Sequence, residues 1–340
     1  MQQPTRRGKP ELVCPAGSLR ALQLAVDAGA DAVYLGLRNQ TNARAFAGMN
    51  FDQAQLRQGV RYAHERGVKV LMALNTFAEA ADPRPWFDAV DSAVDLGADA
   101  LIVADSAVLA HAHERYPQLR LHLSVQASAT SYAAIEYYRQ RYAIQRAVLP
   151  RVLTLSQVAH VARNTQAEVE VFGFGSLCVM VEGRCALSSY ATGCSPNNAG
   201  VCSPAAAVRW QEHDDGSVEA RLGGVLIDTY APGEARAYPT LCKGRFVVEG
   251  RRGYALEEPT SLNTLELLPQ LIECGVAAVK IEGRQRSAQY VAEVARVWRE
   301  AIDAAAAESA YAVRESWTAR LARWAEGQQH TLGAYDRPWR

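Results

Sequence analysis

The sequence predicts an α/β fold, a closed (β/α)8 barrel of the TIM type with one long cysteine-containing insertion. Eight short apolar runs of β type alternate with segments of helical periodicity, which is the pattern of consecutive βα units and a parallel sheet. The GxGxxG turn of an open, doubly wound sheet is absent, so eight such units favour closure into a barrel. The eight runs are Glu11–Ala16, Ala32–Gly36, Lys69–Asn75, Ala100–Asp105, Arg120–Ser128, Arg146–Pro150, Glu168–Phe172 and Ala277–Glu282.

The connecting segments have the apolar periodicity of helices. The clearest are Leu19–Ala28, Asp52–Arg66, Arg84–Leu96 and Leu155–Arg163, and a last helix, Ser287–Ala304, follows the eighth strand. The stretches GADAVYLG and GADALIVAD repeat one half-unit, in which a helix ends and a strand begins. This repetition supports the series of βα units.

Two of the predicted strands carry polar side chains on one face and apolar side chains on the other. The polar face holds Arg120, His122, Ser124, Gln126 and Ser128 in the fifth strand, and Lys280 and Glu282 in the eighth, with Arg284 at its exit. Because the apolar faces should meet the helices, these polar groups are expected inside the barrel or at its mouth. Two interpretations stay open, a structural Lys280–Glu282 network and a polar pocket at the C-terminal face, where barrel active sites lie.

An insertion of residues 173–258 separates the seventh strand from its helix, and insertions of this length in compact domains are usually functional. It contains strand-like pieces at Ala206–Gln211, Arg221–Asp228 and Arg245–Val248. The predicted division is a flexible leader (1–10), seven βα units (11–172), the insertion (173–258), the last barrel unit (259–305) and a C-terminal helix and tail (306–340). The aromatic residues of the tail predict either packing across the barrel bottom or a partner interface.

The composition excludes several classes of protein. Lys and Arg total 36, as do Asp and Glu, so no net field attracts a polyanion and no nucleic-acid partner is expected. No run of about 18 apolar residues exists to span a membrane, and the first ten residues lack the apolar stretch of a secretory signal. The sequence therefore predicts a cytoplasmic protein without a transmembrane segment.

Seven cysteines are too few for a disulfide scaffold in a chain of 340 residues. Four follow the spacing Cys178-x6-Cys185-x16-Cys202-x39-Cys242, each beside turn-forming or small residues, and Cys194 is an additional candidate. Loops of this kind let thiolates converge and expose N–H groups to cluster sulfur. Spacing alone leaves three alternatives open: a [4Fe–4S] cluster, a tetrahedral zinc site and unligated or redox cysteines.

The stretch EVFGFGSLCVMVEGRCALSS resembles the signature of the collagenase-like peptidase family, peptidase U32. The matching positions are Glu170, Phe172, Gly175, Ser176, Leu177, Cys178, Gly183, Cys185, Leu187 and Ser188. The resemblance extends over nearly the whole chain, through TNARAFAGMNF, SVQASAT, LEEPTSLNTLELLP and VKIEGRQRS to TLGAYDRPW. Together these segments resemble most the branch that acts in oxygen-independent ubiquinone biosynthesis.

This resemblance implies a [4Fe–4S] cluster on Cys178, Cys185, Cys202 and Cys242, with Cys194 as a bystander. It also implies a heterodimer with a homologous UbiV-like subunit and hydroxylation of a polyprenylated quinone precursor without O2. Relatives that hydroxylate RNA imply prephenate as a hydroxyl donor. A peptidase, an RNA-modifying hydroxylase and a non-catalytic cluster-bearing scaffold remain as alternatives, although HExxH and GxSxG motifs are absent.

A dicarboxylate donor would need cationic partners at the barrel mouth, because guanidinium groups bind carboxylates in pairs of hydrogen bonds. Lys280 and Arg284 are the predicted catalytic cations, with Glu282 as acid or base. Arg151, Asn75 and Gln126 are predicted to bind substrate, since they end or line barrel strands.

Overall fold

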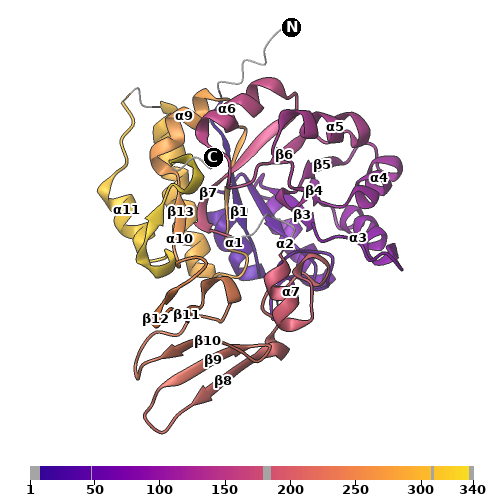
Figure 1. Cartoon of the computed structure of the whole chain (residues 1–340). Helices are drawn as coiled ribbons and strands as arrows, with labels where there is room; N and C mark the ends of the chain where they lie inside the picture. The colour runs from indigo at the N-terminus through magenta and orange to yellow at the C-terminus, as the bar shows by residue number, and fades with distance from the viewer. Residues whose placement is uncertain (1–7, 47, 179–184, 308–309, 337–340) are drawn as a thin grey trace.

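The computed structural model describes residues 8–46, 48–178, 185–307 and 310–336. Eight parallel strands follow the order β14-β1-β2-β3-β4-β5-β6-β7, and β14 pairs with β7 to close the barrel (Figure 1). The predicted fold class is therefore confirmed. The strands are β1 (Glu11–Pro15), β2 (Ala32–Leu35), β3 (Lys69–Leu74), β4 (Ala100–Val103), β5 (Arg120–Leu123), β6 (Arg146–Val148), β7 (Glu168–Ser176) and β14 (Ala278–Ile281). Residues 1–7 of the expected leader and Gly183 of the signature lie outside the described residues.

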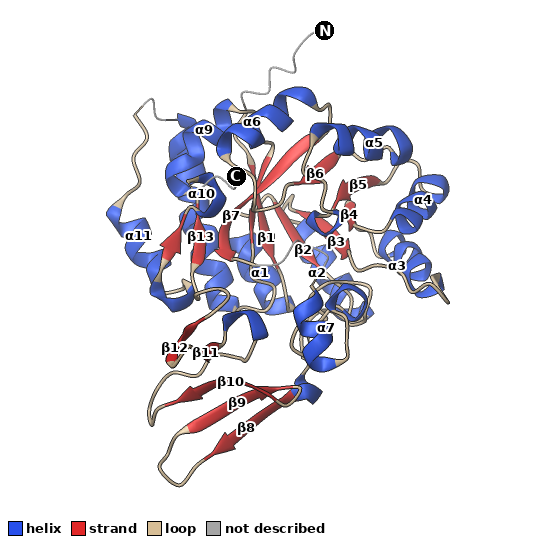
Figure 2. Cartoon of the chain, in the orientation of Figure 1, coloured by secondary structure: helices blue, strands red, loops and turns tan. Residues whose placement is uncertain are grey.

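Helices surround the barrel (Figure 2), and their starting points follow from local sequence. Capping boxes Asp52–Gln55 and Thr154–Gln157 begin α2 and α6, since each side chain satisfies a backbone N–H that the first turn leaves unpaired. Within the described ranges, no helix combines the length and apolar character needed to cross a bilayer. The barrel helices are α1 (Leu19–Asp27), α2 (Gln53–His64), α3 (Arg84–Asp95), α4 (Ser106–Arg115), α5 (Tyr132–Tyr142), α6 (Leu155–Asn164), α9 (Leu268–Glu273) and α10 (Ala288–Ala307).

The repeated Gly-Ala-Asp half-unit has a common geometry in its two copies. Gly29 and Gly97 end their helices with φ of 93° and 83°, a conformation that favours glycine. The following carboxylates, Asp31 and Asp99, accept the N–H of Leu12 and of Val70, each at 2.7 Å. Each repeat therefore turns the chain and ties the new strand to the preceding one.

Two strand predictions need correction. The fifth strand ends at Leu123 rather than Ser128, because the Ser124 side chain caps a 3-10 turn, η1 (Val125–Ala127), and Ser128 adopts a φ of 55°. Gln126 therefore lies in a turn and not on a strand face. The run Arg221–Asp228 is two strands joined at Gly223–Gly224, since both glycines have positive φ and form a tight hairpin.

The insertion emerges from the C-terminal end of β7 and carries small helices and two separate sheets (Figure 1). It runs back to β13 (Ser261–Asn263), which pairs antiparallel with the end of β7, and η4 (Leu265–Leu267) leads into α9. The elements of the insertion are α7 (Ala186–Thr192), α8 (Pro196–Ala199), η2 (Ala205–Ala207), β8 (Val208–Glu212), β9 (Val218–Leu222), β10 (Val225–Tyr230), η3 (Leu241–Lys243), β11 (Arg245–Val248) and β12 (Arg251–Tyr254).

The C-terminal tail consists of α11 (Glu315–Ala322), η5 (Glu326–Gln328), β15 (His330–Thr331) and η6 (Gly333–Tyr335). Trp317 is buried and donates to Glu300 of α10 at 2.8 Å, so α11 packs on the outside of the barrel. Strand β15 pairs with β13, beside the C-terminal end of β7. The expectation that the tail packs across the barrel bottom is therefore wrong for this part.

An ionic network fills the barrel interior at the N-terminal ends of the strands. Arg146 is central to it, because it contacts Glu11 and Glu168 at 2.7 Å and Glu170 at 3.3 Å. Lys280 donates to Glu170 at 2.8 Å. The predicted structural partner of Lys280 was Glu282, so the network exists with a different carboxylate. Glu170 is fully buried, and such a charge is tolerated only when paired.

His122 of β5 lies near this network and makes folding sensitive to acid. The residue is 2% exposed, and neither ring nitrogen has a hydrogen-bond partner among the described residues. Burial, helped by Arg146 and Arg120, holds the pKa of His122 well below its ordinary value of 6.5. As pH falls below 6.5, the unfolded chain binds a proton that the folded chain does not, so stability falls.

We expect His122→Leu to remove this part of the acid sensitivity. The free energy of unfolding of the native chain should lose about 1.4 kcal/mol more per pH unit than that of the variant below pH 6.5. Urea unfolding at pH 7.5 and pH 5.5 measures the difference. Equal slopes in the two proteins would contradict a buried, neutral His122.

Candidate functional site

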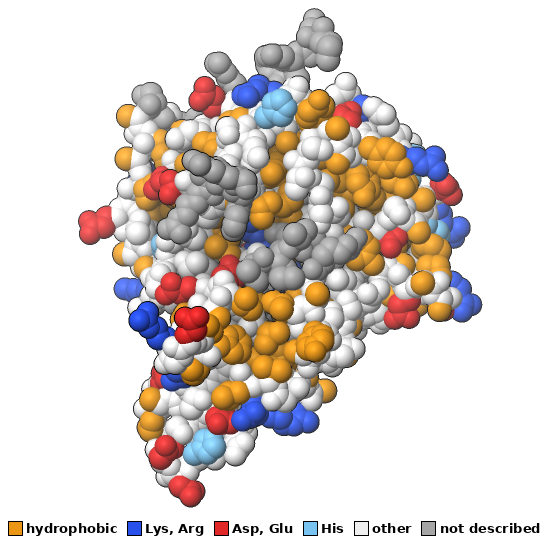
Figure 3. Space-filling view, viewed as in Figure 1, with side chains coloured by type: hydrophobic (Ala, Val, Ile, Leu, Met, Phe, Trp, Pro, Cys, Tyr) orange, Lys and Arg blue, Asp and Glu red, His pale blue; other side chains and the backbone are white. Residues whose placement is uncertain are grey.

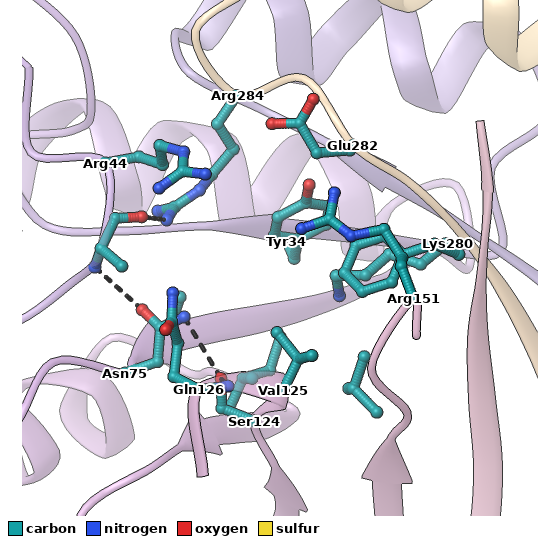
Figure 4. Close-up of a pocket in the computed structure, with 15 residues that line it drawn as sticks. Tyr34, Arg44, Asn75, Ser124, Val125, Gln126, Arg151, Lys280, Glu282 and Arg284 are labelled. Carbon is teal, nitrogen blue, oxygen red and sulfur yellow. Dashed lines mark hydrogen bonds between the residues drawn. The ribbon is translucent and has the colours of Figure 1, made fainter. Parts of the chain in front are cut away.

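A pocket lined by polar and charged side chains opens at the C-terminal ends of the barrel strands (Figure 4). All six residues predicted for catalysis and substrate binding line it: Asn75, Gln126, Arg151, Lys280, Glu282 and Arg284. Ser124 of the predicted polar face also lines it, and Tyr34 and Arg44 add polar groups that the sequence did not single out. The structure therefore brings the predicted residues together, while their roles stay predictions.

Arg284 follows β14 and is 4% exposed. Its guanidinium donates to Asn42 Oδ1 at 2.8 Å and to the carbonyl of Ala43. Burial lowers the pKa of Arg284 to about 10, so the group stays cationic at neutral pH. Arg284 therefore holds the 42–43 loop against the pocket and carries a charge there.

Lys280 contributes a second buried cation to the pocket. Its ammonium lies 3.9 Å from the centroid of the Tyr34 ring, in cation–π contact, besides its bond to Glu170. Burial lowers the pKa of Lys280, and the neighbouring Glu170 carboxylate opposes that shift. Lys280 thus joins the ionic network below to the pocket above.

Glu282 provides a carboxylate among these cations. Burial alone would raise the pKa of Glu282, but Arg44 and Arg151 together with hydrogen bonds from Gln285 and the Ser176 N–H hold it below its ordinary value. The group is therefore ionised at neutral pH. Of its two predicted roles, base rather than acid fits this state.

Asn75 and Gln126 meet at the hydroxyl of Ser124. The Asn75 amide donates to Ser124 Oγ at 3.3 Å and its carbonyl oxygen accepts the N–H of Ala43 at 3.0 Å. The Gln126 backbone N–H donates to the same hydroxyl at 3.2 Å. Two connections of the barrel are therefore fixed to each other on this side of the pocket.

Arg44 is the main pocket residue that sequence reasoning missed. Its φ of 124° is unusual for a residue with a side chain, and its backbone is held by bonds to Gly200 O at 2.7 Å and from Asn50 Nδ2 at 2.8 Å. Burial alone would lower the pKa of Arg44, but Cys202, Glu282 and Cys178 raise it. Arg44 therefore lies in the electrostatic range of both the pocket carboxylate and the cysteines.

The four predicted cluster cysteines share one electrostatic neighbourhood. Burial raises the pKa of the Cys202 thiol, and Cys178 and Cys185 add to that rise. Burial likewise raises the pKa of Cys242 to about 11, with contributions from Cys178 and Cys202. Cys194 is exposed and, within the described ranges, is not among the main electrostatic partners of these two thiols.

The loops of Cys185, Cys202 and Cys242 each form a hydrogen bond to another segment at or near the cysteine. The Cys185 N–H donates to Asn197 Oδ1 at 3.4 Å, and Asn197 O accepts the N–H of Phe77, which follows β3. The Arg44 N–H reaches Gly200, two residues before Cys202. The Cys242 carbonyl accepts the N–H of Glu257 at 3.1 Å.

Ser176, two residues before Cys178, joins the cysteine loops to the pocket. Its N–H donates to Glu282 Oε2 at 3.2 Å, and its carbonyl accepts from Arg151. The Arg151 guanidinium also stacks over Phe172, 4.5 Å from the ring centroid. The end of β7 therefore contacts pocket side chains while it leads the chain into the first cysteine loop.

Cys178, Cys185, Cys202 and Cys242 supply the type of ligand that the implied cluster needs. Four thiols in turn-rich loops match the ligands of a [4Fe–4S] cluster, and their mutual electrostatic contacts place them around one region. In the part of the chain that the structure describes, no three His, Cys, Asp or Glu side chains converge closely enough to hold a metal ion. The donor chemistry therefore matches a cluster, the described side chains are not drawn together as ligands, and the ligand set stays a prediction.

A family model described as peptidase family U32 matches residues 17–336. The chain belongs to the peptidase U32 family. It is 31% identical over 323 residues to tRNA hydroxylation protein P of Escherichia coli K12, covering 88% of this chain and 69% of that protein. It is 34% identical over 301 residues to an uncharacterised protease of Methanocaldococcus jannaschii, covering 86% of this chain and 65% of the relative.

A solved U32 peptidase structure aligns with 52% of this chain and 74% of its own, at 14% identity and a TM-score of 0.43.

The residues that line the pocket give little support to the peptidase activity that the family name suggests. No histidine is among the described residues that line it. His64 and His111 instead contact Asp99 and Asp91, at 2.8 and 3.2 Å. A catalytic Cys–His or Ser–His pair would need a histidine at the reacting centre.

Proposed function

We propose that the chain is an O2-independent hydroxylase component that carries a [4Fe–4S] cluster on Cys178, Cys185, Cys202 and Cys242. The observation that carries the proposal is the contact of Ser176 with both Glu282 and Arg151, because it joins the first cysteine loop to a cationic pocket. A bound cluster would relay electrons between the ring, which is oxidised, and the hydroxyl donor, which is reduced. Relatives named as tRNA hydroxylation proteins support hydroxylation as the reaction class.

The pocket residues have separate roles in this proposal. Arg44 and Arg284 outnumber Glu282, and Lys280 is balanced by Glu170, so an anionic co-substrate is favoured. A carboxylate-bearing hydroxyl donor such as prephenate would suit these cations. Glu282, ionised among them, would accept the proton released on hydroxylation. Asn75 and Gln126 would orient the substrate through neutral hydrogen bonds.

The first candidate substrate is the ring of a polyprenylated quinone precursor, hydroxylated together with a homologous UbiV-like subunit. The sequence segments that resemble UbiU, the ubiquinone branch of the family, support it. The insertion also offers a surface for a partner, because hydrophobic side chains gather over it (Figure 3). Of the twelve large hydrophobic side chains exposed in the described residues, nine lie there: Tyr190, Trp210, Val225, Leu226, Tyr238, Val247, Val248, Tyr254 and Leu256.

The second candidate substrate is tRNA, and the names of the curated relatives favour it over the first. Those relatives are longer than this chain, which spans 68–69% of three of them. A balanced charge of 36 basic and 36 acidic residues gives no general attraction to RNA. Recognition of tRNA would therefore depend on local contacts.

Metabolic analysis of anaerobic cells distinguishes the candidates, because a cell supplies partner and donor. Bacteria lacking the chain are grown without O2 and complemented with the native chain or with Cys202→Ala. Loss of ubiquinone, restored only by the native chain, would support the quinone ring. Loss of hydroxylated tRNA nucleosides would support tRNA. If both products persist without the chain, the proposed function is wrong.

A further inference from the structure

A carboxylate from the C-terminal tail reaches the loops of two cysteines. Glu326 of η5 accepts the hydroxyl of Ser176 at 2.5 Å through Oε1 and contacts the ammonium of Lys243 through Oε2. Ser176 precedes Cys178 by two residues, and Lys243 follows Cys242 directly. One side chain therefore bridges the loops of Cys178 and Cys242, which are 64 residues apart in the sequence.

The bridge is partly shielded from water. The side chains of Lys243 and Glu326 are 15% and 23% exposed, which strengthens their attraction relative to that of an open surface pair. Arg286 lies farther from Glu326, at 3.9 Å, and donates to the carbonyl of Trp324 at 2.7 Å. Two cations thus face the carboxylate, and the closer one is next to a cysteine.

The backbone of the tail is built to hold Glu326 in this place. The Glu326 N–H donates to Ser261 Oγ at 2.9 Å, and Ser261 of β13 pairs with Ser176 in register. The next residue, Gly327, has a φ of 57°, and a Cβ there would lie 2.2 Å from the carbonyl oxygen of Pro259. Only glycine fits this close approach, so the turn that presents Glu326 is sterically defined.

We propose that the Lys243–Glu326 pair is a positioning pair for the cysteine centre. It fixes the loop of Cys242 relative to that of Cys178, and it places the Lys243 ammonium, paired with the Glu326 carboxylate, next to Cys242. The identity of the bound group rests on the proposed function, whereas the bridge between the loops does not. Outer partners of metal ligands act in this way, by orienting the ligands and tuning the site.

The first test needs no bound cluster. Hydrogen–deuterium exchange of the full chain without metal is compared for the native protein, Glu326→Ala and the control Glu315→Ala. Glu315 is an exposed carboxylate at the start of α11 in the same tail. We expect faster exchange in residues 174–178 and 240–244 of Glu326→Ala alone. Unchanged exchange in both segments would overturn the proposal.

The second test uses the anaerobic protein loaded with its cluster. Glu326→Gln and Lys243→Met should each lose the visible absorption to a chelator about 10-fold faster than the native protein. Their reduction potentials should move in opposite directions, because one variant removes a negative charge and the other a positive charge. The double variant should stay labile with a potential near that of the native protein.

The outcomes separate the two proposals. Potentials that move in the same direction, or chelator rates equal to that of the control Glu315→Ala, would overturn the positioning pair. A native chain that takes up no cluster would overturn the proposed function, and the exchange measurement would still decide whether Glu326 bridges the loops.

Discussion

Replacing any one of Cys178, Cys185, Cys202 and Cys242 with alanine should abolish the cluster. The broad visible absorption and the iron and sulfide content of the anaerobically purified protein should then fall to background. A [4Fe–4S] cluster on four thiolates has no spare protein ligand, so one missing thiol leaves an iron without its protein ligand. Cys178 and Cys185 influence the Cys202 thiol, and Cys178 and Cys202 influence the Cys242 thiol, which is why all four are the proposed ligands.

Cys194→Ala is the matched control, since Cys194 lies in the same insertion and is exposed. Its spectrum and iron content should equal those of the native protein. A spectrum lost in Cys194→Ala and kept in Cys202→Ala would show that the two exchange roles. A colourless native protein with stoichiometric zinc would make the site structural and contradict electron transfer.

The barrel could be predicted from sequence because its signals are local. Each strand is a short apolar run. In each copy of the repeated half-unit a glycine ends the helix, and the following aspartate accepts a backbone N–H that lies within about 30 residues along the chain. The fifth strand was predicted too long because that prediction also used only a local signal. The alternation Arg120, His122, Ser124, Gln126 continues past Leu123, but the Ser124 side chain caps a turn, which alternation alone does not reveal.

The site could be predicted only where its residues lie in the barrel strands or within a few residues of their ends. Lys280 lies in β14, Glu282 and Arg284 follow it, and alternation with barrel topology predicts all three. Arg44 lies in a loop whose position depends on Gly200, and Glu326 meets Ser176 across 150 residues. Such contacts leave no periodic signal, because they arise from how distant loops pack at the barrel mouth.

Glu170→Ala should destabilise the fold by about 3–5 kcal/mol, because it leaves the buried Lys280 without its counter-charge. Arg146 would be less affected, since Glu11 and Glu168 remain in contact with it. Chemical denaturation measures the loss. A Glu170→Ala protein as stable as the native one would mean that Lys280 becomes neutral or finds water.

The double variant Glu170→Met/Lys280→Met removes both charges and should recover most of that stability, because apolar side chains of similar volume often replace buried ion pairs without loss. Product formation in this folded variant then isolates the role of Lys280. The ammonium has three donors, and its bond to Glu170 uses one, so donors remain for a ligand in the pocket that it lines. We therefore expect a stable, cluster-bearing and inactive protein. An active double variant would restrict Lys280 to the ionic network and leave the arginines to bind the anion.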